Sequence, residues 1–266
     1  MLSSDHVAMM VKVLNPGRRS VLIGGAAAAG VTIATGRPQG ASARSPAEGP
    51  WAVELFTSQG CNSCPPADTF LGKLAKRPDI VALSFHVDYW DYIGWKDPFA
   101  SRETTERQRA YARVLKQRYV YTPEMVVDGI GHDTGREPGP IEALLAKAQA
   151  LSPKRATPEL SRTIGGPLTI KLAAFPLDGR KADVTLAIYD RRHATPVNSG
   201  ENQGRTIENF NIVRQLERVS RWNGTATSWA IAGDRIGPTQ GVAVLVQHTD
   251  HGPMIGCNKL EPAYFG

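Results

Sequence analysis

Two cysteines separated by two residues lie where a predicted strand passes into a predicted helix, and this stretch restricts the fold more than any other. The apolar run 51–55 predicts a buried strand. Cys61 and Cys64 follow it, and a helix is expected to begin at Cys64 or Pro65. Proline suits the first helical turn because its missing N–H would have no partner there. The chain must therefore place both thiols at the end of a strand, beside the start of a helix.

The residues after the pair alternate between strands and helices. Strands are expected at 80–87, 121–129 and 131–136, and helices at 99–119 and 141–151. Asp128-Gly129 predicts a tight hairpin turn. A strand-helix-strand unit needs a crossover connection, which favours a parallel pair, and the hairpin adds an antiparallel edge. The region 51–152 is therefore expected to form a mixed sheet flanked by helices.

With the cysteine pair at the end of its first strand, this α/β arrangement resembles the thioredoxin fold. Thr122-Pro123 falls where that fold places a cis-proline opposite the cysteines. The resemblance implies that Pro123 presents the neighbouring backbone to a substrate strand and that Thr122 hydrogen-bonds the incoming peptide. The spacing around Cys61 is closer to glutaredoxins, and the tryptophan that precedes the first cysteine of thioredoxins is absent.

A longer part of the chain resembles an exported bacterial family of thioredoxin-like proteins, known as domain of unknown function 1223. The matching segments are 53–68, 86–91, 121–123 and 200–206. The resemblance extends over nearly the whole mature chain and implies a thioredoxin-like fold. The family has no assigned biochemical role, so function must be argued from the residues.

Thiol–disulfide exchange needs one thiolate that attacks and a second thiol that resolves the mixed disulfide. The positive end of the helix dipole is expected to stabilise the thiolate of Cys61, which makes Cys61 the predicted nucleophile. Cys64, one turn into the helix, is the predicted resolving thiol. Glu54, in the preceding strand, is a candidate proton relay to Cys64, the alternatives being a surface charge or a structural ion pair.

Two other interpretations of the pair stay open. Cys61 and Cys64 with His86 on the neighbouring strand would form a copper site, as in exported copper chaperones built on a thioredoxin scaffold. Zinc is less suited because the chain holds no second CxxC. The pair could also be a structural disulfide in a binding module, and a single histidine at a strand end is more often structural than a ligand.

The second half of the chain predicts an all-β domain. Residues 153–160, with two prolines, are expected to be a linker, and 161–266 a β-sandwich-like domain of short strands and glycine-rich turns. Its predicted strands are 168–172, 182–190, 209–219, 227–231 and 241–247. The segment 200–205 is either a binding loop or a turn, and Cys257 is either a free thiol or an intermolecular partner.

The N-terminal residues 1–43 resemble a twin-arginine export signal. Arg18-Arg19 precedes a weakly apolar stretch rich in glycine and alanine, and Ala41-Ser42-Ala43 offers small residues for cleavage. The stretch is too short for a comfortable membrane span. We therefore expect a periplasmic or extracellular protein with a flexible mature start at 44–50 and no stable membrane span after cleavage.

The charge balance excludes an obvious nucleic-acid partner. Beyond residue 43 the chain holds 27 basic and 24 acidic residues, without a basic run that carries interleaved aromatics. The sequence therefore favours a thiol–disulfide oxidoreductase that acts on thiols or disulfides of exported proteins. It needs no bound organic cofactor, because the cysteines carry the electrons. The direction of exchange depends on the reduction potential, which the residues between the cysteines do not indicate.

Overall fold

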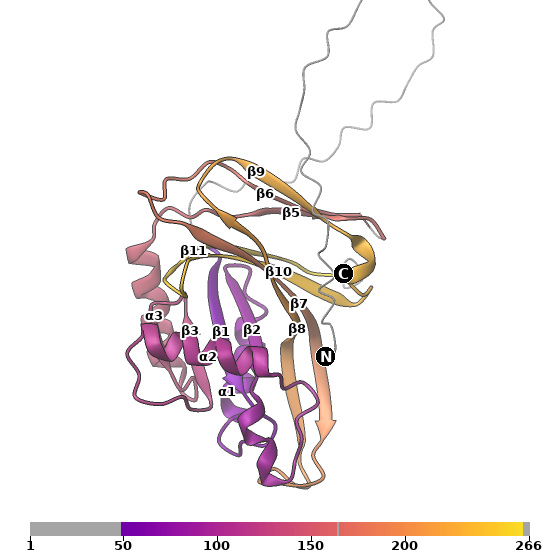
Figure 1. Ribbon diagram of the computed structural model, residues 1–266. Helices are drawn as coiled ribbons and strands as arrows, with labels where there is room; N and C mark the ends of the chain where they lie inside the picture. The colour runs from indigo at the N-terminus through magenta and orange to yellow at the C-terminus, as the bar shows by residue number, and fades with distance from the viewer. Residues whose placement is uncertain (1–48, 164, 263–266) are drawn as a thin grey trace, which may run out of the picture. The chain divides into compact units, whose positions relative to one another are not determined.

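A mixed sheet of eight strands, in the order β11-β10-β7-β8-β2-β1-β3-β4, is the centre of the fold. The structure is a computed structural model that describes residues 49–163 and 165–262 (Figure 1). The predicted signal segment 1–43 and residues 44–48 lie outside the described residues. Within them, the protein is a mixed α/β structure with few helices.

The elements have the following bounds. The eight-stranded sheet consists of β1 (Trp51–Thr57), β2 (Ile80–His86), β3 (Glu124–Val127), β4 (Gly131–Asp133), β7 (Ala182–Pro196), β8 (Thr206–Trp222), β10 (Gln240–His248) and β11 (Met254–Leu260). A second, three-stranded sheet consists of β5 (Glu159–Arg162), β6 (Leu168–Leu172) and β9 (Thr227–Ile231). The helices are α1 (Pro65–Leu74), α2 (Arg102–Val114) and α3 (Pro138–Leu151), with short 3-10 helices η1 (Asp88–Ile93) and η2 (Gly233–Arg235).

The first strands carry apolar side chains on both faces, because helices cover both. β1 runs parallel to β2 and antiparallel to β3. Val53 and Leu55 of β1 pack on one face with side chains of α1 and α3. Phe56 packs on the other face, in a cluster that includes Tyr111 of α2. Alternation along β1 therefore decides which helix each side chain meets.

The predicted turn at Asp128-Gly129 is confirmed. Both residues have positive φ, 49° and 68°, between the antiparallel strands β3 and β4. A Cβ atom on Gly129 would lie 2.8 Å from the carbonyl oxygen of Gly252, so the turn also fits closely against the loop before β11. The hairpin thus uses glycine both for its φ angle and for this close approach.

The second half of the chain continues the same sheet. The three-stranded sheet packs on one face of β7 and β10, where Ile170, Leu186 and Val244 belong to one buried cluster. On the opposite face, Ala187 and Leu245 share a cluster with Phe85 of β2. Residues on both sides of the predicted linker 153–160 therefore pack in a common core. The division into two domains at this linker stays a prediction.

The hairpin of β7 and β8 is much longer than the sequence predicts. Its strands hold 15 and 17 residues and stay paired from Ala182↔Trp222 to Pro196↔Thr206. Figure 1 shows both strands extending well beyond β10 and β11. Ile212 of β8 pairs with Ser84 of β2, which directs the rest of the hairpin alongside α1.

Among the described residues, no helix is long and apolar enough to cross a membrane.

Candidate functional site

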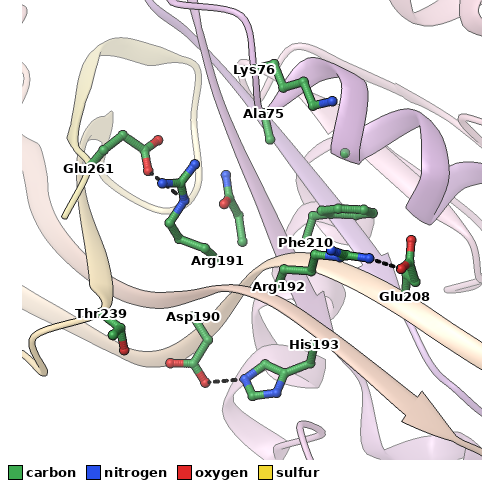
Figure 2. Close-up of a pocket in the computed structure, with 12 residues that line it drawn as sticks. Ala75, Lys76, Asp190, Arg191, Arg192, His193, Glu208, Phe210, Thr239 and Glu261 are labelled. Carbon is green, nitrogen blue, oxygen red and sulfur yellow. Dashed lines mark hydrogen bonds and ion pairs between the residues drawn. The ribbon is translucent and has the colours of Figure 1, made fainter. Parts of the chain in front are cut away.

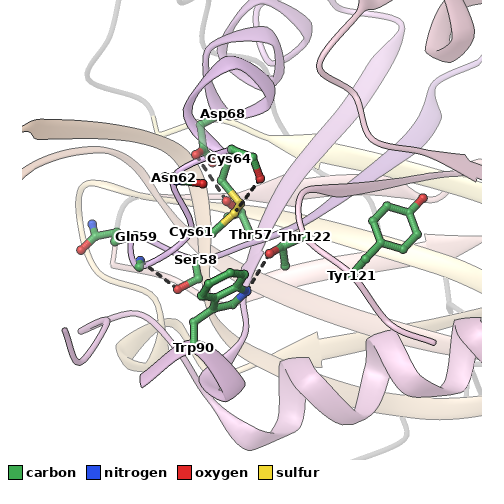
Figure 3. Close-up of a disulfide and its surroundings, with 12 residues drawn as sticks. Thr57, Ser58, Gln59, Cys61, Asn62, Cys64, Asp68, Trp90, Tyr121 and Thr122 are labelled. Atoms are coloured by element: carbon green, nitrogen blue, oxygen red, sulfur yellow. Dashed lines mark hydrogen bonds between the residues drawn. A yellow bond between two sulfur atoms is a disulfide. The ribbon is translucent and has the colours of Figure 1, made fainter. Parts of the chain in front are cut away.

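The two cysteines form a disulfide at the start of α1, in the position that the sequence predicts. Cys61 and Cys64 are bonded, and Cys64 is the N-terminal cap residue of α1 (Figure 3). Its carbonyl oxygen accepts hydrogen bonds from the N–H groups of Ala67 and Asp68. Pro65 and Pro66 have no N–H, so this helix start leaves few N–H groups to stabilise a thiolate.

Both cysteine side chains are fully buried, each with a relative exposure of 0%. Cys61, the predicted nucleophile, is therefore as buried as Cys64, the predicted resolving thiol. The exposed side chain of the turn is Asn62. The ring of Trp90, in η1, lies beside the disulfide in Figure 3. A partner can therefore reach the sulfur of Cys61 only if the side chains around the disulfide move.

The Thr122–Pro123 peptide bond is cis, as the resemblance implies. Thr122 lies near the disulfide in Figure 3, and its hydroxyl accepts a 2.7 Å hydrogen bond from Trp90 Nε1. This bond joins the segment before β3 to the aromatic helix η1. In this arrangement the threonine hydroxyl holds Trp90 in place instead of facing an incoming peptide.

Glu54 is not brought to the cysteines. Its carboxylate accepts hydrogen bonds of 2.5 and 2.9 Å from Arg107 and one of 2.6 Å from the hydroxyl of Tyr111, both on α2. The reason is strand alternation, since Glu54 shares the α2 face of β1 with Phe56, whereas Thr57 lies on the α1 face. The structural ion pair, one of the alternatives for Glu54, is what the structure contains.

A different carboxyl group lies beside the pair. Asp68, one helical turn after Cys64, is buried and accepts a 3.3 Å hydrogen bond from the Thr57 hydroxyl (Figure 3). Its other oxygen has no hydrogen-bond partner among the described residues. Burial raises the pKa of Asp68 to about 7, against the opposing attraction of His86. The sequence holds a sign of this buried carboxyl group, because Asp68 falls between Ala67 and Phe70 on the apolar face of α1.

His86 lies in a buried polar cluster next to Asp68. Its Nδ1 is 2.7 Å from Asp97 Oδ2, and its Nε2 has no partner among the described residues. Burial would raise the pKa of Asp97. The nearby His86 and the N–H groups of Gln59 and Phe99 outweigh burial, so the pKa lies below its ordinary value. The Asp97 carboxylate thus lies beneath the loop that carries Cys61, where it accepts a 2.8 Å hydrogen bond from the N–H of Gln59.

The copper interpretation required His86 to join the two cysteines. Within residues 49–163 and 165–262, no group of three or more histidine, cysteine or acidic side chains is arranged to hold a metal ion. His86 instead bonds Asp97 and packs edge-on against Phe99, with ring centroids 5.3 Å apart. The described residues therefore do not assemble the predicted ligand set.

The tip of the β7–β8 hairpin, residues 197–205, contacts the cysteine loop directly. The buried side chain of Asn202 donates hydrogen bonds of 2.9 and 3.0 Å to the carbonyl oxygens of Gln59 and Cys61. Glu201 Oε2 accepts a 3.3 Å hydrogen bond from the N–H of Asn62. The segment 200–205, left open between a binding loop and a turn, is a turn whose side chains bind the chain's own cysteine loop.

A separate cavity of about 820 Å³ is lined by residues of α1, β7 and β8 (Figure 2). Gly72 of α1 lines it together with Ala75 and Lys76, which directly follow that helix, and with Phe210 of β8. Two ion pairs lie in its lining, Arg192 with Glu208 and Arg191 with Glu261, and Asp190 lies 3.0 Å from His193 Nε2. Neither cysteine lines this cavity, so it is not part of the disulfide site.

The chain is similar to one protein family and to one solved structure. The profile of a family described as "Protein of unknown function (DUF1223)" matches residues 52–247. The chain is similar to an X-ray crystal structure of a structural-genomics protein from Agrobacterium tumefaciens, with 32% identity and a TM-score of 0.71. That similarity covers 82% of this chain and 96% of the other. No curated protein matches the chain.

Proposed function

Because the chain belongs to the DUF1223 family, whose description assigns no function, we propose from its own site that it is a thiol–disulfide oxidoreductase with a thioredoxin-like arrangement. Support for the arrangement comes from the parallel pair of β1 and β2 and from the antiparallel β3–β4 hairpin. The cis bond at Thr122–Pro123, close to the disulfide, supports it further. The substrates would be thiols or disulfides of exported proteins.

The observation that carries the proposal is the buried carboxyl group of Asp68 beside the Cys61–Cys64 disulfide. Its pKa of about 7 lets it take up or release a proton near neutral pH. A disulfide with only a structural role needs no such group, and burying an ionisable carboxyl group without full hydrogen bonding is costly. This cost suggests a role in proton transfer.

In the proposed reaction, the reduced protein attacks a substrate disulfide through the Cys61 thiolate. One substrate sulfur joins Cys61 in a mixed disulfide, and the other leaves as a thiolate that takes up a proton. Asp68 then accepts the proton of Cys64, whose thiolate attacks Cys61 and releases the second substrate sulfur. The protein ends with its own disulfide, so two electrons have passed to the substrate. Run in reverse, the same steps oxidise a substrate dithiol.

The test is an equilibrium titration of the mature protein in glutathione redox buffers, with Cys64→Ser as the trapping variant. We expect a reversible two-electron couple and a stable mixed disulfide at Cys61 in the variant. Cys61→Ser is the matched control and should trap much less. A folded protein whose disulfide stays intact across the whole glutathione range would exclude the proposal.

A second candidate function, a binding module braced by a structural disulfide, is favoured by one observation. Both cysteines have 0% exposure, and reactive thiols usually lie in partly exposed sites. The two candidates differ in reduction of the native protein. An oxidoreductase is reduced by dithiothreitol within minutes while it stays folded, whereas a structural disulfide is reduced only when the protein unfolds.

Export by the twin-arginine route is the proposed path to an oxidising compartment. The proposal rests on Arg18-Arg19 and on the small residues at 41–43. Replacing both arginines with lysine should retain the precursor in the cytoplasm, and cell fractionation measures this. A variant that still reaches the periplasm would contradict the proposed route.

A further inference from the structure

The tip of the β7–β8 hairpin contacts the cysteine loop through side chains that lie about 140 residues further along the chain. Only the root of the hairpin pairs with β10, along Ala182–Asp190. Beyond Asp190, β7 is largely exposed, whereas β8 packs beside α1 and buries Ile207 and Asn209. Ordering a long two-stranded extension costs conformational entropy, and the contacts that its tip makes with the cysteine loop are polar hydrogen bonds.

The side-chain amide of Asn202 has all its main hydrogen-bonding groups engaged. Its nitrogen donates to the carbonyl oxygens of Gln59 and Cys61, and its oxygen accepts a 2.7 Å hydrogen bond from Arg205. The bond from Arg205 fixes which end of the amide faces the cysteine loop. An alanine at this position would remove the hydrogen bond to the Gln59 carbonyl and would leave the Cys61 carbonyl with only its 3.2 Å bond from the N–H of Cys64.

The neighbouring Glu201 affects the electrostatic surroundings of the cysteine loop rather than the position of the loop. Its carboxylate accepts the N–H of Asn62, the residue directly after Cys61. Since Pro65 and Pro66 offer no N–H, the N–H of Asn62 is one of few backbone donors in this turn, which also holds the Ser63 hydroxyl 3.4 Å from Cys61 Sγ. Glu201 occupies this N–H and adds a negative charge near the sulfur, which disfavours a second negative charge there.

We infer that the hairpin tip sets the reactivity of the cysteine pair, with Asn202 as a positioning residue for the loop of Cys61 and Glu201 as a charge that disfavours its thiolate. The inference rests on the proposed function. Because the thiolate belongs to the reduced state, Glu201 shifts the equilibrium towards the disulfide. Asn202 holds the loop in the geometry in which Cys61 is buried, and so it slows access to the sulfur.

The experiment compares the wild type with Glu201→Gln and Asn202→Ala in glutathione buffers. The reaction measured is protein disulfide plus two glutathione thiols giving protein dithiol plus glutathione disulfide. For E201Q we expect the equilibrium constant for reduction to rise about three-fold at low salt, and less at high salt because Glu201 is exposed. For N202A we expect reduction to be about ten-fold faster, because access to the sulfur controls the rate.

The control is Glu159→Gln on β5, an exposed glutamate in the other sheet, which should leave both quantities unchanged. Asn202→Leu keeps the size of the side chain without a donor or a charge and should behave like N202A, which separates lost hydrogen bonds from lost volume. If the wild type exchanges with glutathione but E201Q and N202A match it in equilibrium constant and rate, the inference alone is wrong. If the wild type does not exchange at all, the proposed function fails as well.

Discussion

Arg107 Nε lies 2.5 Å from Glu54 Oε2, and both side chains are buried, with exposures of 7% and 1%. A second Arg107 nitrogen also reaches Gln247 of β10 at 3.3 Å, and Gln247 donates to the Tyr111 hydroxyl. The ion pair thus joins β1, α2 and β10 within one network. It ties the segment that carries the cysteines to the sheet contributed by the second half of the chain.

The first prediction concerns this pair. Glu54→Gln or Arg107→Met leaves one buried charge without its partner, so each should lower the free energy of unfolding by about 3–5 kcal/mol. The double variant Glu54→Met with Arg107→Met should cost less than either change alone, because no charge is left unpaired. Urea unfolding measures both. The control is Arg109→Met, which breaks an exposed pair with Glu106 and should change stability by less than about 1 kcal/mol.

The same variants separate a structural role from a proton relay. If Glu54 only stabilises the fold, the E54Q protein that remains folded should reduce and reoxidise at the rate of the wild type. A relay role would slow the resolving step of E54Q while its stability stayed near that of the wild type. Equal rates with lowered stability are the outcome expected from the observed contacts.

The second prediction is the pH dependence of stability from Asp68. Burial raises its pKa from 3.8 to about 7, so the folded protein keeps a proton that the unfolded chain releases. The stabilising contribution is fully present below about pH 4 and is lost as the pH rises through about 7. Relative to Asp68→Asn, wild-type stability should fall by on the order of 4 kcal/mol over this range. Parallel curves for the two proteins, measured by urea unfolding, would contradict the raised pKa.

The third prediction is kinetic and follows from the proposed proton transfer. In D68N the mixed disulfide at Cys61 should resolve about 100-fold more slowly at pH 7, because Cys64 loses its proton acceptor. The wild-type rate should rise with pH through an apparent pKa near 7, and D68N should lack this rise. Stopped-flow measurement of mixed-disulfide decay tests both. The control is Asp79→Asn, a partly exposed carboxylate paired with Arg77, which should leave the rate unchanged.

The fourth prediction concerns Cys257, the free cysteine among the described residues. Its thiol is buried and donates a 3.1 Å hydrogen bond to the carbonyl oxygen of Pro50. Burial raises the pKa of this thiol to about 12, so almost no thiolate forms near neutral pH. In the folded protein, iodoacetamide should leave Cys257 unmodified, and mass spectrometry should find it alkylated only after unfolding. Alkylation at the rate of an exposed thiol would contradict this.

Local signals predicted the elements that position the cysteines. The apolar run 51–55 and Pro65 predicted β1 and the start of α1, and Asp128-Gly129 predicted its turn. These signals work because they depend on neighbours in the sequence, namely on backbone angles, missing N–H groups and periodicity. The expected strand at 80–87 is β2, and the expected helix at 99–119 shortens to α2.

What the sequence does not show is which distant groups meet. Glu54 was matched with the cysteines by its position in the strand before them, but alternation turns it towards Arg107. The strand at 182–190 was expected to stop at Asp190, because the next residues lack a buried face, yet pairing alone continues β7 to Pro196. Asn202 could not be assigned to the cysteine loop, since no local pattern records a contact across about 140 residues.

The reach of the β7–β8 hairpin has a consequence for anyone who wishes to shorten this protein. A chain that ends at residue 152 keeps both cysteines, α1 and the cis-proline, and by sequence it looks like a minimal redox unit. It would lose Asn202, which pairs the carbonyl groups of Gln59 and Cys61, and Gln247, which completes the network of Arg107. The smallest folded fragment should therefore extend from β1 to β11, and it should keep β5, β6 and β9, whose apolar side chains cover one face of β7 and β10.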